Sequence, residues 1–425
     1  MKYATYSEYK SSGIGWIRDF PAHWELKRLK YVANRAEAKV EADEGNPLPY
    51  IGLEQIEPWT GRLIDLDDDL VPTGVSNRFA AGDTLFGKLR PYLAKACNVD
   101  FDGLCSSELL VLRGKTYDHK FLLYQLLSHG FVNLVDSSTY GSKMPRASWD
   151  FIGICELPLP PVDEQQTIAR FLDAKTAQID ALVAQKRQLV DKLKEKRQAL
   201  ITRTVTRGLP PEAAKAAGLE PNPMMKDSGV DWLGQIPKHW TAKAVRYIFR
   251  NCDSRRIPLS SEERADLEKL YPYYGASGVI DMVDDYLFDE PLVLVAEDGA
   301  NLLSRSTPLA FLASGKYWVN NHAHILKPLA GDIRYWVATL ETFDFSPLIT
   351  GAAQPKLTAD RLGGIQLPVP PANEQTAISD YLAAKTGELD ALVGQAVEVV
   401  DRLTEYRQAL ITSAVTGKID VRELA

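Results

Sequence analysis

The chain carries one long segment twice. The sequence LPLPPVDEQQTIARFLDAKTAQIDALV, at Leu157–Val183, returns 210 residues later as LPVPPANEQTAISDYLAAKTGELDALV, at Leu367–Val393, without a gap. A second pair precedes these segments, SGIGWIRDFPAHW at Ser12–Trp24 and SGVDWLGQIPKHW at Ser228–Trp240. The residues between the paired signatures differ almost completely. Repetition on this scale indicates two copies of one structural unit, here two variable regions in two similar frames.

Length and composition agree with at least two globular domains. A chain of 425 residues exceeds what one hydrophobic core usually serves. With 45% hydrophobic and 25% charged residues, no long apolar run and no signal-peptide pattern, we expect a cytoplasmic protein that does not associate with membranes. The net charge of −7 argues mildly against a nucleic-acid binder, but Lys and Arg cluster locally, so the composition alone does not decide.

Each repeated segment predicts a long helix. Pro161 and Pro371 stop an earlier helix, and Asp163 and Asn373 are good N-cap residues. Apolar residues then recur on alternating three- and four-residue steps, in the first copy at Leu172, Ile179, Leu182, Leu189, Leu193 and Leu200. This heptad spacing favours a coiled coil, in which the two helices pack antiparallel and relate the halves by a pseudo-two-fold axis. Packing of each helix on its own domain alone remains an alternative.

The variable regions read as compact mixed domains. Short strand-like pieces such as DTLFGKL, SELLVLRG, PLVLVAED and AHILKPL alternate with turn residues, and HKFLLYQLLSH and IRYWVATLE predict short helices. The expected fold class is therefore α+β, with two mixed α/β domains separated by two long antiparallel coiled-coil helices. The expected boundaries are a first domain, a central helix, a linker with the second opening signature, a second domain and a C-terminal helix with its tail, at 1–156, 157–207, 208–240, 241–366 and 367–425.

These motifs together resemble the specificity subunit of type I restriction-modification systems. The resemblance rests on SGVDWLGQIPKHW, GDTLFGKLRPYLAKA, YYGASGVIDMVDDYLFDEPLVLVAEDGANL, LPLPPVDEQQTIARFLD and YRQALITSAVTGK, and it covers nearly the whole chain. It implies two target recognition domains that each read one half of a bipartite sequence in double-stranded DNA. It further implies that the helices fix the spacer and bind two methyltransferase subunits, and through them the restriction and translocase subunits.

No catalytic set is recognisable in the sequence. A methyltransferase needs a glycine-rich cofactor loop and an Asn/Asp-Pro-Pro-aromatic stretch, and a translocase needs a phosphate-binding loop, but neither pattern occurs. The four cysteines show no paired spacing, and His322 and His324 lack a third ligand at suggestive spacing. We therefore expect no catalytic residues, no metal and no cofactor. A hydrolase that uses His322 or His324 is a weaker alternative.

The DNA-binding candidates are basic, amide, hydroxyl and aromatic side chains of the variable regions. Arg146 and Lys356 occupy the same place in two Gly–Pro loops at the 210-residue offset, where a basic residue suits a phosphate, while arginine suits guanine and amides suit adenine. For each candidate a core or surface role stays open. The set is Lys88, Arg90, Tyr92, Ser142, Lys143, Arg146, Tyr273, Tyr274, Ser277, Asn301, Arg305, Asn320, Asn321, Gln354 and Lys356.

The partner-binding candidates are apolar residues of the long helices, namely Leu182, Leu189, Leu193, Leu392, Val399 and Leu403. A different class of function also fits the architecture: an adaptor whose two domains grip proteins or glycans across a coiled-coil ruler. The two hypotheses differ in a simple property, because such an adaptor would not bind DNA at low salt.

Overall fold

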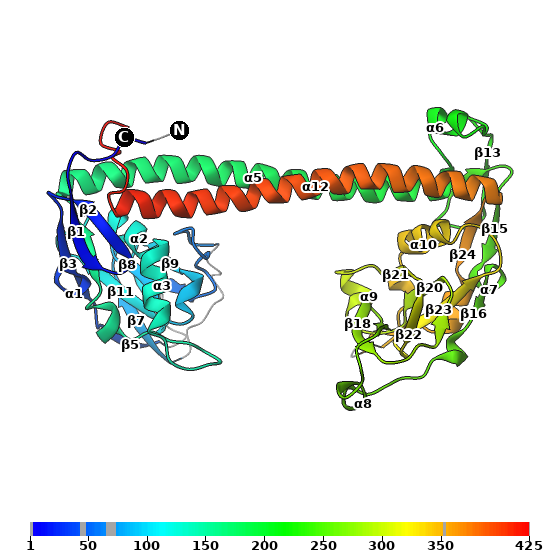
Figure 1. Ribbon diagram of the computed structural model, residues 1–425, viewed down its shortest axis with the longest axis horizontal. Coiled ribbons are helices and arrows are strands. Elements are labelled where there is room, and N and C mark those ends of the chain that lie inside the picture. The colour runs from blue at the N-terminus through cyan, green and yellow to red at the C-terminus, as the bar shows by residue number, and fades with distance from the viewer. Residues whose placement is uncertain (1–2, 43–47, 65–73, 352–353, 425) are drawn as a thin grey trace. The chain divides into compact units, whose positions relative to one another are not determined.

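The computed structural model describes most of the chain, as residues 3–42, 48–64, 74–351 and 354–424 (Figure 1). It divides into two compact units. Unit 1 is Met1–Gln188 with Val397–Ala425, and unit 2 is Leu189–Ala396. Each unit holds one variable region and part of each long helix, α5 (Val162–Arg207) and α12 (Ala372–Val415).

Unit 1 is built on two four-stranded sheets. The first has the order β4-β11-β8-β9, with β4 at Ala33–Arg35, β11 at Leu109–Gly114, β8 at Thr84–Gly87 and β9 at Ala96–Asn98. The second has the order β5-β7-β10-β6, with β5 at Lys39–Ala42, β7 at Gly74–Phe79, β10 at Gly103–Cys105 and β6 at Tyr50–Ile51. The remaining elements are β1 (Tyr9–Ile14), β2 (Ile17–Pro21), β3 (Glu25–Arg28), β12 (Glu156–Leu159), α1 (Leu29–Val32), α2 (His119–Leu126), α3 (His129–Ser137) and α4 (Trp149–Ile152), with a 3-10 turn at Pro91–Leu93.

Unit 2 repeats the first sheet and part of the second. The first sheet has the order β16-β23-β20-β21, with β16 at Phe249–Asn251, β23 at Ala323–Pro328, β20 at Leu292–Ala296 and β21 at Ala310–Ala313. The second has the order β18-β17-β22-β19, with β18 at Gly278–Val283, β17 at Tyr271–Gly275, β22 at Lys316–Val319 and β19 at Phe288–Asp289. The others are β13 (Met225–Asp227), β14 (Gln235–Pro237), β15 (Thr241–Ala244), β24 (Gln366–Val369), α6 (Pro211–Ala216), α7 (Val245–Ile248), α8 (Ser261–Ala265), α9 (Asn301–Ser304), α10 (Ile333–Thr342) and α11 (Ala359–Gly364), with 3-10 turns at Asp253–Arg255 and Ser346–Leu348.

Strand pairing gives the equivalent positions of the two domains. In unit 1, β11 pairs antiparallel with β8, with Leu110 opposite Phe86. In unit 2, β23 pairs antiparallel with β20, with His324 opposite Val295. The second sheets share a parallel pair, β6 with β10 and β17 with β22. The sheet frameworks therefore correspond although the sequences do not. The expected strands and the helices at α2 and α10 are confirmed.

In each unit the opening signature contacts the first turn of a long helix. In unit 1, His23 of the opening signature bonds Glu164 in the first turn of α5, at 2.9 Å between Nε2 and Oε2. In unit 2, Glu374 at the start of α12 accepts from His239 at 2.8 Å and from the indole of Trp240 at 3.0 Å. Trp24 and Trp240 are both fully buried. In each unit the histidine of the opening signature therefore holds the first turn of the long helix.

A glycine ends each long helix beside the opening signature of the same unit. Gly417 has φ +72° and lies close to Trp24, and Gly208 has φ +84° and lies close to Trp240. This left-handed backbone favours glycine. Trp24 is thus packed near the start of α5 and the end of α12, whereas Trp240 is packed near the start of α12 and the end of α5.

The inward positions of α5 and α12 follow a strict heptad, but not with the expected phase. The least exposed positions step by four and three residues, through Leu172, Thr176, Ile179, Val183, Lys186, Val190, Leu193 and Arg197 in α5 and through the residues 210 places later in α12. The expectation that Leu182 and Leu189 lie in the buried seam was wrong, because both are exposed. The apolar neighbours Val183 and Val190 occupy the seam instead.

Candidate nucleic-acid interface

A small hairpin closes each variable region next to its first sheet. In unit 1 the backbones of Tyr140 and Arg146 bond each other at 3.1 Å, and in unit 2 those of Thr350 and Lys356 bond at 2.8 and 2.9 Å. The glycine that follows the first residue of each bridge has a positive φ, +89° at Gly141 and +87° at Gly351. The Gly–Pro pattern of the sequence therefore encodes a tight turn that presents one basic residue at its base.

The hairpin of unit 1 borders a hollow lined by basic and polar side chains. Arg146 is held by Glu108, with Nε 3.1 Å from Oε2. Lys88 lines the same hollow and has no carboxylate partner among the described residues. The remaining polar lining is Arg35, Glu37, Lys39, Asn77, Ser107, Tyr140 and Ser148. Lys39 and Lys88 add positive charge to the lining, while Arg35 pairs with Glu37. The hollow is therefore a local concentration of basic side chains in a chain whose net charge is −7.

Four further candidates of unit 1 lie in exposed positions near this hairpin. Arg90 adopts φ +50° and its amide donates to the carbonyl of Pro145 at 2.8 Å. Tyr92 is exposed in the turn that follows, and Ser142 and Lys143 are exposed at the tip of the hairpin. A non-glycine residue with positive φ is uncommon and is concentrated at functional sites. Lys88, Arg90, Ser142, Lys143 and Arg146 are thus brought to one edge of the domain.

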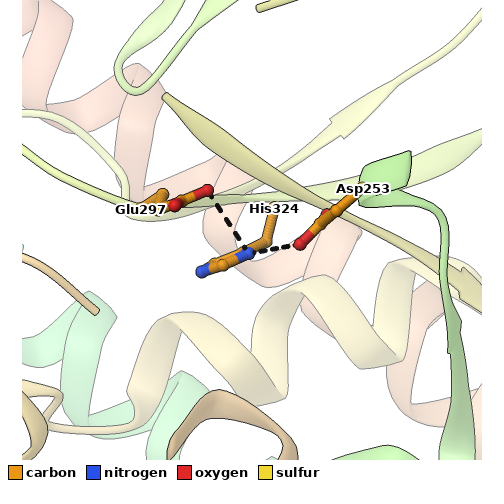
Figure 2. Close-up of side chains that lie close together, drawn as sticks. All are labelled: Asp253, Glu297 and His324. Atoms are coloured by element: carbon orange, nitrogen blue, oxygen red, sulfur yellow. Dashed lines mark hydrogen bonds and ion pairs between the residues drawn. The ribbon is translucent and has the colours of Figure 1, made fainter. Parts of the chain in front are cut away.

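In unit 2 the hairpin is attached to a buried ionic cluster (Figure 2). His324 of β23 is buried, with Nδ1 2.7 Å from Oδ2 of Asp253 and 3.6 Å from Oε2 of Glu297. Lys356 bonds Glu297, with Nζ 3.1 Å from Oε1, and Arg256 bonds the other carboxylate oxygen of Glu297. Burial favours the neutral form of Glu297, but the bond from Arg256, the charge on His324 and the bond from Lys356 outweigh it and lower the pKa of Glu297.

The structure removes several candidates of unit 2 from a DNA-reading role. The ring of Tyr273 is buried and its hydroxyl bonds the backbone of Leu259. Asn320 is also buried, and its side-chain oxygen accepts from the amide of His322. Successive side chains of a strand such as β17 point to opposite faces of the sheet, and the sequence does not say which face is covered.

Two other candidates serve the local structure. The side chain of Asn301 accepts from Ser306 and from the amide of Thr307 and donates to the carbonyl of Thr307. Arg305 bonds the backbone at the end of α10 and pairs with Glu341. Both side chains hold the loop after β20 in place, although Arg305 is exposed, so their role in DNA binding stays a prediction.

The remaining candidates of unit 2 lie near the hairpin. Ser277 is exposed in the turn between β17 and β18, Asn321 is exposed just before β23, and Gln354 is exposed next to Lys356. The half-buried ring of Tyr274 stacks on Phe311 at 6.0 Å. The amide of Asn320 bonds the carbonyl of Tyr274 at 3.0 Å, and that of Glu297 bonds the carbonyl of His322 at 2.9 Å. These bonds join the end of β17, the segment before β23 and the segment after β20 at one edge of the domain.

Sequence reasoning missed the residues that surround the two basic positions. Arg35, Lys39 and Tyr140 line the hollow of unit 1, and Asp253, Arg256 and Glu297 complete the cluster of unit 2. Asp253 and His324 are separated by 71 residues. The pairing of β16 with β23 brings them together, and no local sequence signal reports that pairing.

Of the partner-binding candidates, four lie on the exposed surface of the helices. Leu182 and Leu189 are exposed, as are Leu392 and Val399, which lie 210 residues further on. Leu193 is half-buried, and Leu403 packs against the core of unit 1. Within each helix, the two exposed apolar residues are seven places apart and so lie on the same face. The 210-residue offset gives both helices the same pair of exposed apolar positions.

Across the described residues, no helix has the length and apolar character needed to cross a bilayer.

One group in the described part of the chain has the donor set of a metal site, namely Asp253, Glu297 and His324. Their ligand atoms lie within 4.8 Å of one another. Arg256 and Lys356 already neutralise this group, and a divalent cation there would face both of these positive side chains. The donor set therefore fits a network of ion pairs better than a metal.

Comparisons with known proteins agree with this architecture. The family model described as type I restriction modification DNA specificity domain matches residues 21–192 and 237–395. A putative type I restriction enzyme specificity subunit of Haemophilus influenzae is 37% identical over 164 residues, which are 38% of this chain and 39% of that protein. The MjaVIII specificity subunit of Methanocaldococcus jannaschii is 21% identical over 446 residues, 95% of each chain.

The chain spans only about 40% of the length of the first curated relatives it matches, 39% and 42%. Among solved structures, a chain of a type I R-M system covers 94% of this chain and 99% of its own length, with a TM-score of 0.69 and 18% identity. That likeness shows the fold. Because the family model matches most of the chain, once in each copy of the repeat, the chain belongs to the family of type I restriction-modification specificity subunits.

Proposed function

We propose that this chain is the DNA-recognition subunit of a type I restriction-modification complex. The regions of 1–156 and 241–366 are its two recognition domains, and each reads one half of a bipartite double-stranded site. One observation carries this proposal: two equivalent frameworks present a basic residue, Arg146 or Lys356, at the base of the same hairpin. The side chains around the two hairpins differ completely, so the two half-sites differ in sequence.

The basic hollow of unit 1 supports phosphate binding as the source of affinity. Lys88, Arg35 and Lys39 line it together with Arg146, while the chain as a whole carries a net charge of −7. A protein of this charge attracts DNA only where positive residues are concentrated. We infer that partner subunits supply the rest of the positive surface. Base specificity then comes from side chains at the hairpin edge and from DNA shape.

We further propose that α5 and α12 form an antiparallel coiled coil that relates the two halves by a pseudo-two-fold axis. Two ion pairs support this arrangement, Asp180 with Arg407 in unit 1 and Arg197 with Asp390 in unit 2, each at 2.9 Å. The 210-residue offset converts one pair into the other. The duplicated apolar surface at Leu182 and Leu392 is then the docking surface for two methyltransferase subunits, which recruit the restriction subunits.

Recognition, and not chemistry, is the role that we assign to this chain. Methylation of specific sites therefore requires the methyltransferase partner. Mapping the methylated sites tests the proposal directly. Genomic DNA from cells that express the chain with its neighbouring methyltransferase would be sequenced for methylated bases, beside cells that express the methyltransferase alone. We expect a bipartite methylated motif only when the chain is present. Methylation that does not depend on the chain, or the absence of DNA binding by the complex at low salt, would favour the adaptor hypothesis.

A further inference from the structure

His324 lies at the centre of the ionic cluster and faces acceptors with both ring nitrogens. Nδ1 lies 2.7 Å from a carboxylate oxygen of Asp253, and Nε2 lies 2.9 Å from the backbone carbonyl of Leu357. A carbonyl only accepts, and an ionised carboxylate only accepts, so both nitrogens must carry hydrogen. With Asp253 ionised, this geometry therefore favours the doubly protonated imidazolium. The side chain is 2% exposed, so water does not satisfy either nitrogen.

The charges around His324 support this form. Asp253, in the turn that follows β16, and Glu297, just after β20, are negative, while Arg256 and Lys356 are positive. The pair of His322 and Asp298 lies on the adjoining segments. Burial lowers the pKa of His324, but the bonds to Asp253 and to the Leu357 carbonyl, with the charges on Asp253 and Glu297, outweigh it and raise the pKa. Burial raises the pKa of Asp253, but the hydrogen bonds from His324, the Ile325 amide and Asn251 outweigh it, so the pKa of this carboxyl is lowered.

The cluster fixes the hairpin of unit 2 on both sides of Lys356. The amide of Leu357 donates to the carbonyl of Glu297 at 2.7 Å, and the amide of Gly299 donates to the carbonyl of Pro355 at 3.1 Å. The imidazolium adds a charged bond to the carbonyl of Leu357, directly after Lys356. In unit 1 the position equivalent to His324 is Leu110, which has no side-chain donor. Only unit 2 therefore has an ionisable group at this place in the framework.

We infer that His324 is a positioning residue that fastens the Lys356 hairpin through its two ring hydrogens, so that losing one of them loosens this hairpin and not its counterpart at Arg146. The effect on DNA rests on the proposed function, because the hairpin then weakens its hold on the second half-site. The fastening itself does not depend on DNA. For a histidine with a raised pKa, the contribution is complete below the ordinary value of 6.5 and is lost as the pH rises through the raised value.

The first test measures the protonation state of His324 in the full chain. The protein contains six histidines, so selective ¹⁵N labelling and long-range ¹H–¹⁵N spectra resolve them, and the H324Q variant assigns the signal. At pH 6.5 an ordinary histidine is half ionised. We expect His324 to be mostly doubly protonated at that pH. A neutral tautomer at pH 6.5 would overturn the inference.

The second test follows hydrogen exchange at the amides of Lys356 and Leu357, with Arg146 and Ala147 as the internal reference. Removing a charged hydrogen bond should speed exchange about tenfold in H324Q. H322Q is the matched control, because the side chain of His322 is exposed and its ring bonds only Asp298 among the described residues. In the wild-type chain, protection at Lys356 relative to Arg146 should fall as the pH rises. This comparison needs no variant, so it decides the question even if H324Q does not fold. Equal protection at all pH values would refute the fastening role.

The third test separates this inference from the proposed function and from metal binding. Methylation mapping of the H324Q complex should show relaxed specificity in the second half-site alone, with H322Q unchanged. If the wild-type complex recognises no DNA, the proposed function fails, while spectra and exchange still report on the fastening. Elemental analysis of the purified chain should find no bound zinc or other transition metal in stoichiometric amount. Stoichiometric metal that is lost in H324Q would overturn the inference.

Discussion

Arg407 and Arg197 open two copies of the same six-residue sequence, RQALIT, but their surroundings differ. Each pairs with an aspartate at 2.9 Å, Arg407 with Asp180 and Arg197 with Asp390. The side chain of Arg407 is only 7% exposed, whereas that of Arg197 is 38% exposed. The helices repeat, but the domains beside them do not. Identical sequence therefore gives identical secondary structure here without giving an identical environment.

A segment of the variable region of unit 1 covers Arg407. The guanidinium donates to the carbonyl oxygens of Trp59 at 2.8 Å and Thr60 at 3.0 Å, and Arg62 joins the same aspartate at 2.7 Å. Trp59 adopts φ +65° and stacks on His129. Such a strained backbone persists only when its surroundings hold it. Arg197 has no equivalent cover among the described residues, so unit 1 has a second attachment between domain and helices that unit 2 lacks.

The largest effect is expected from replacing one domain and leaving its frame intact. Exchanging residues 25–156 for the equivalent region of a related chain should replace one half of the methylated motif and leave the other unchanged. Methylation mapping measures the result. The donor region should supply its own cover for Arg407, since the bonds that Arg407 donates to the carbonyl oxygens of Trp59 and Thr60 are lost with the exchanged domain. A change in both halves would show that the domains do not read independently.

A second change separates the helices from both domains. Inserting one heptad into α5 after Gln188 and one into α12 after Ala396 keeps the four-and-three pattern in phase. Seven residues at 1.5 Å add about 10 Å, or about three base pairs of DNA. We expect the spacer of the methylated motif to grow by about that amount while both half-sites stay the same. Two residues inserted at each place instead rotate the following segment by roughly 200°, and specific methylation should largely disappear. An unchanged spacer after the heptad insertions would show that the helices do not set the distance.

The two arginines test whether the cover matters energetically. R407M leaves the partly buried Asp180 with only Arg62 as its ion-pair partner, which should cost about 3 kcal/mol of unfolding free energy. R197M removes an exposed pair and should cost about 0.5 kcal/mol or less. Hydrogen exchange measured at increasing urea concentrations resolves the two units and would give the cost of each substitution. Equal costs would mean that the segment around Trp59 contributes nothing to the stability of unit 1.

The frame of this protein could be predicted from sequence because its signals are local or repeated. A heptad and a proline boundary act within one helix, and the 210-residue offset reveals the second copy. The helix phase was harder, because Leu182 and Val183 are both apolar and either could enter the seam. Val183 does so, and Leu182 faces outward.

The site was less predictable because side chains from distant segments complete it. Lys88 and Arg146 were both recognised as basic, but their shared hollow depends on the sheet of unit 1. His324 was considered as a metal ligand, whereas its partners Asp253 and Glu297 directly follow strands whose pairing the sequence does not reveal. Burial of Tyr273 likewise depends on which face of β17 is covered.

The smallest effect concerns the polar residues at equivalent framework positions. Lys88 directly follows β8 and Glu297 directly follows β20, so one position carries opposite charges in the two domains. Lys88 has no carboxylate partner among the described residues, so its full charge is available to a phosphate. K88Q should lower the slope of log affinity against log salt by about 0.9. The affinity of K88Q for DNA, relative to the wild type, should then recover about 3.5-fold between 50 and 200 mM salt, while the preferred sequence stays the same.

K120Q is the control, because Lys120 pairs with Asp173 at 2.7 Å. Binding of the assembled complex to its mapped site, measured across that salt range, decides the matter. A changed base preference in K88Q would mean that Lys88 reads a base edge, and an unchanged salt slope would mean that it does not contact DNA.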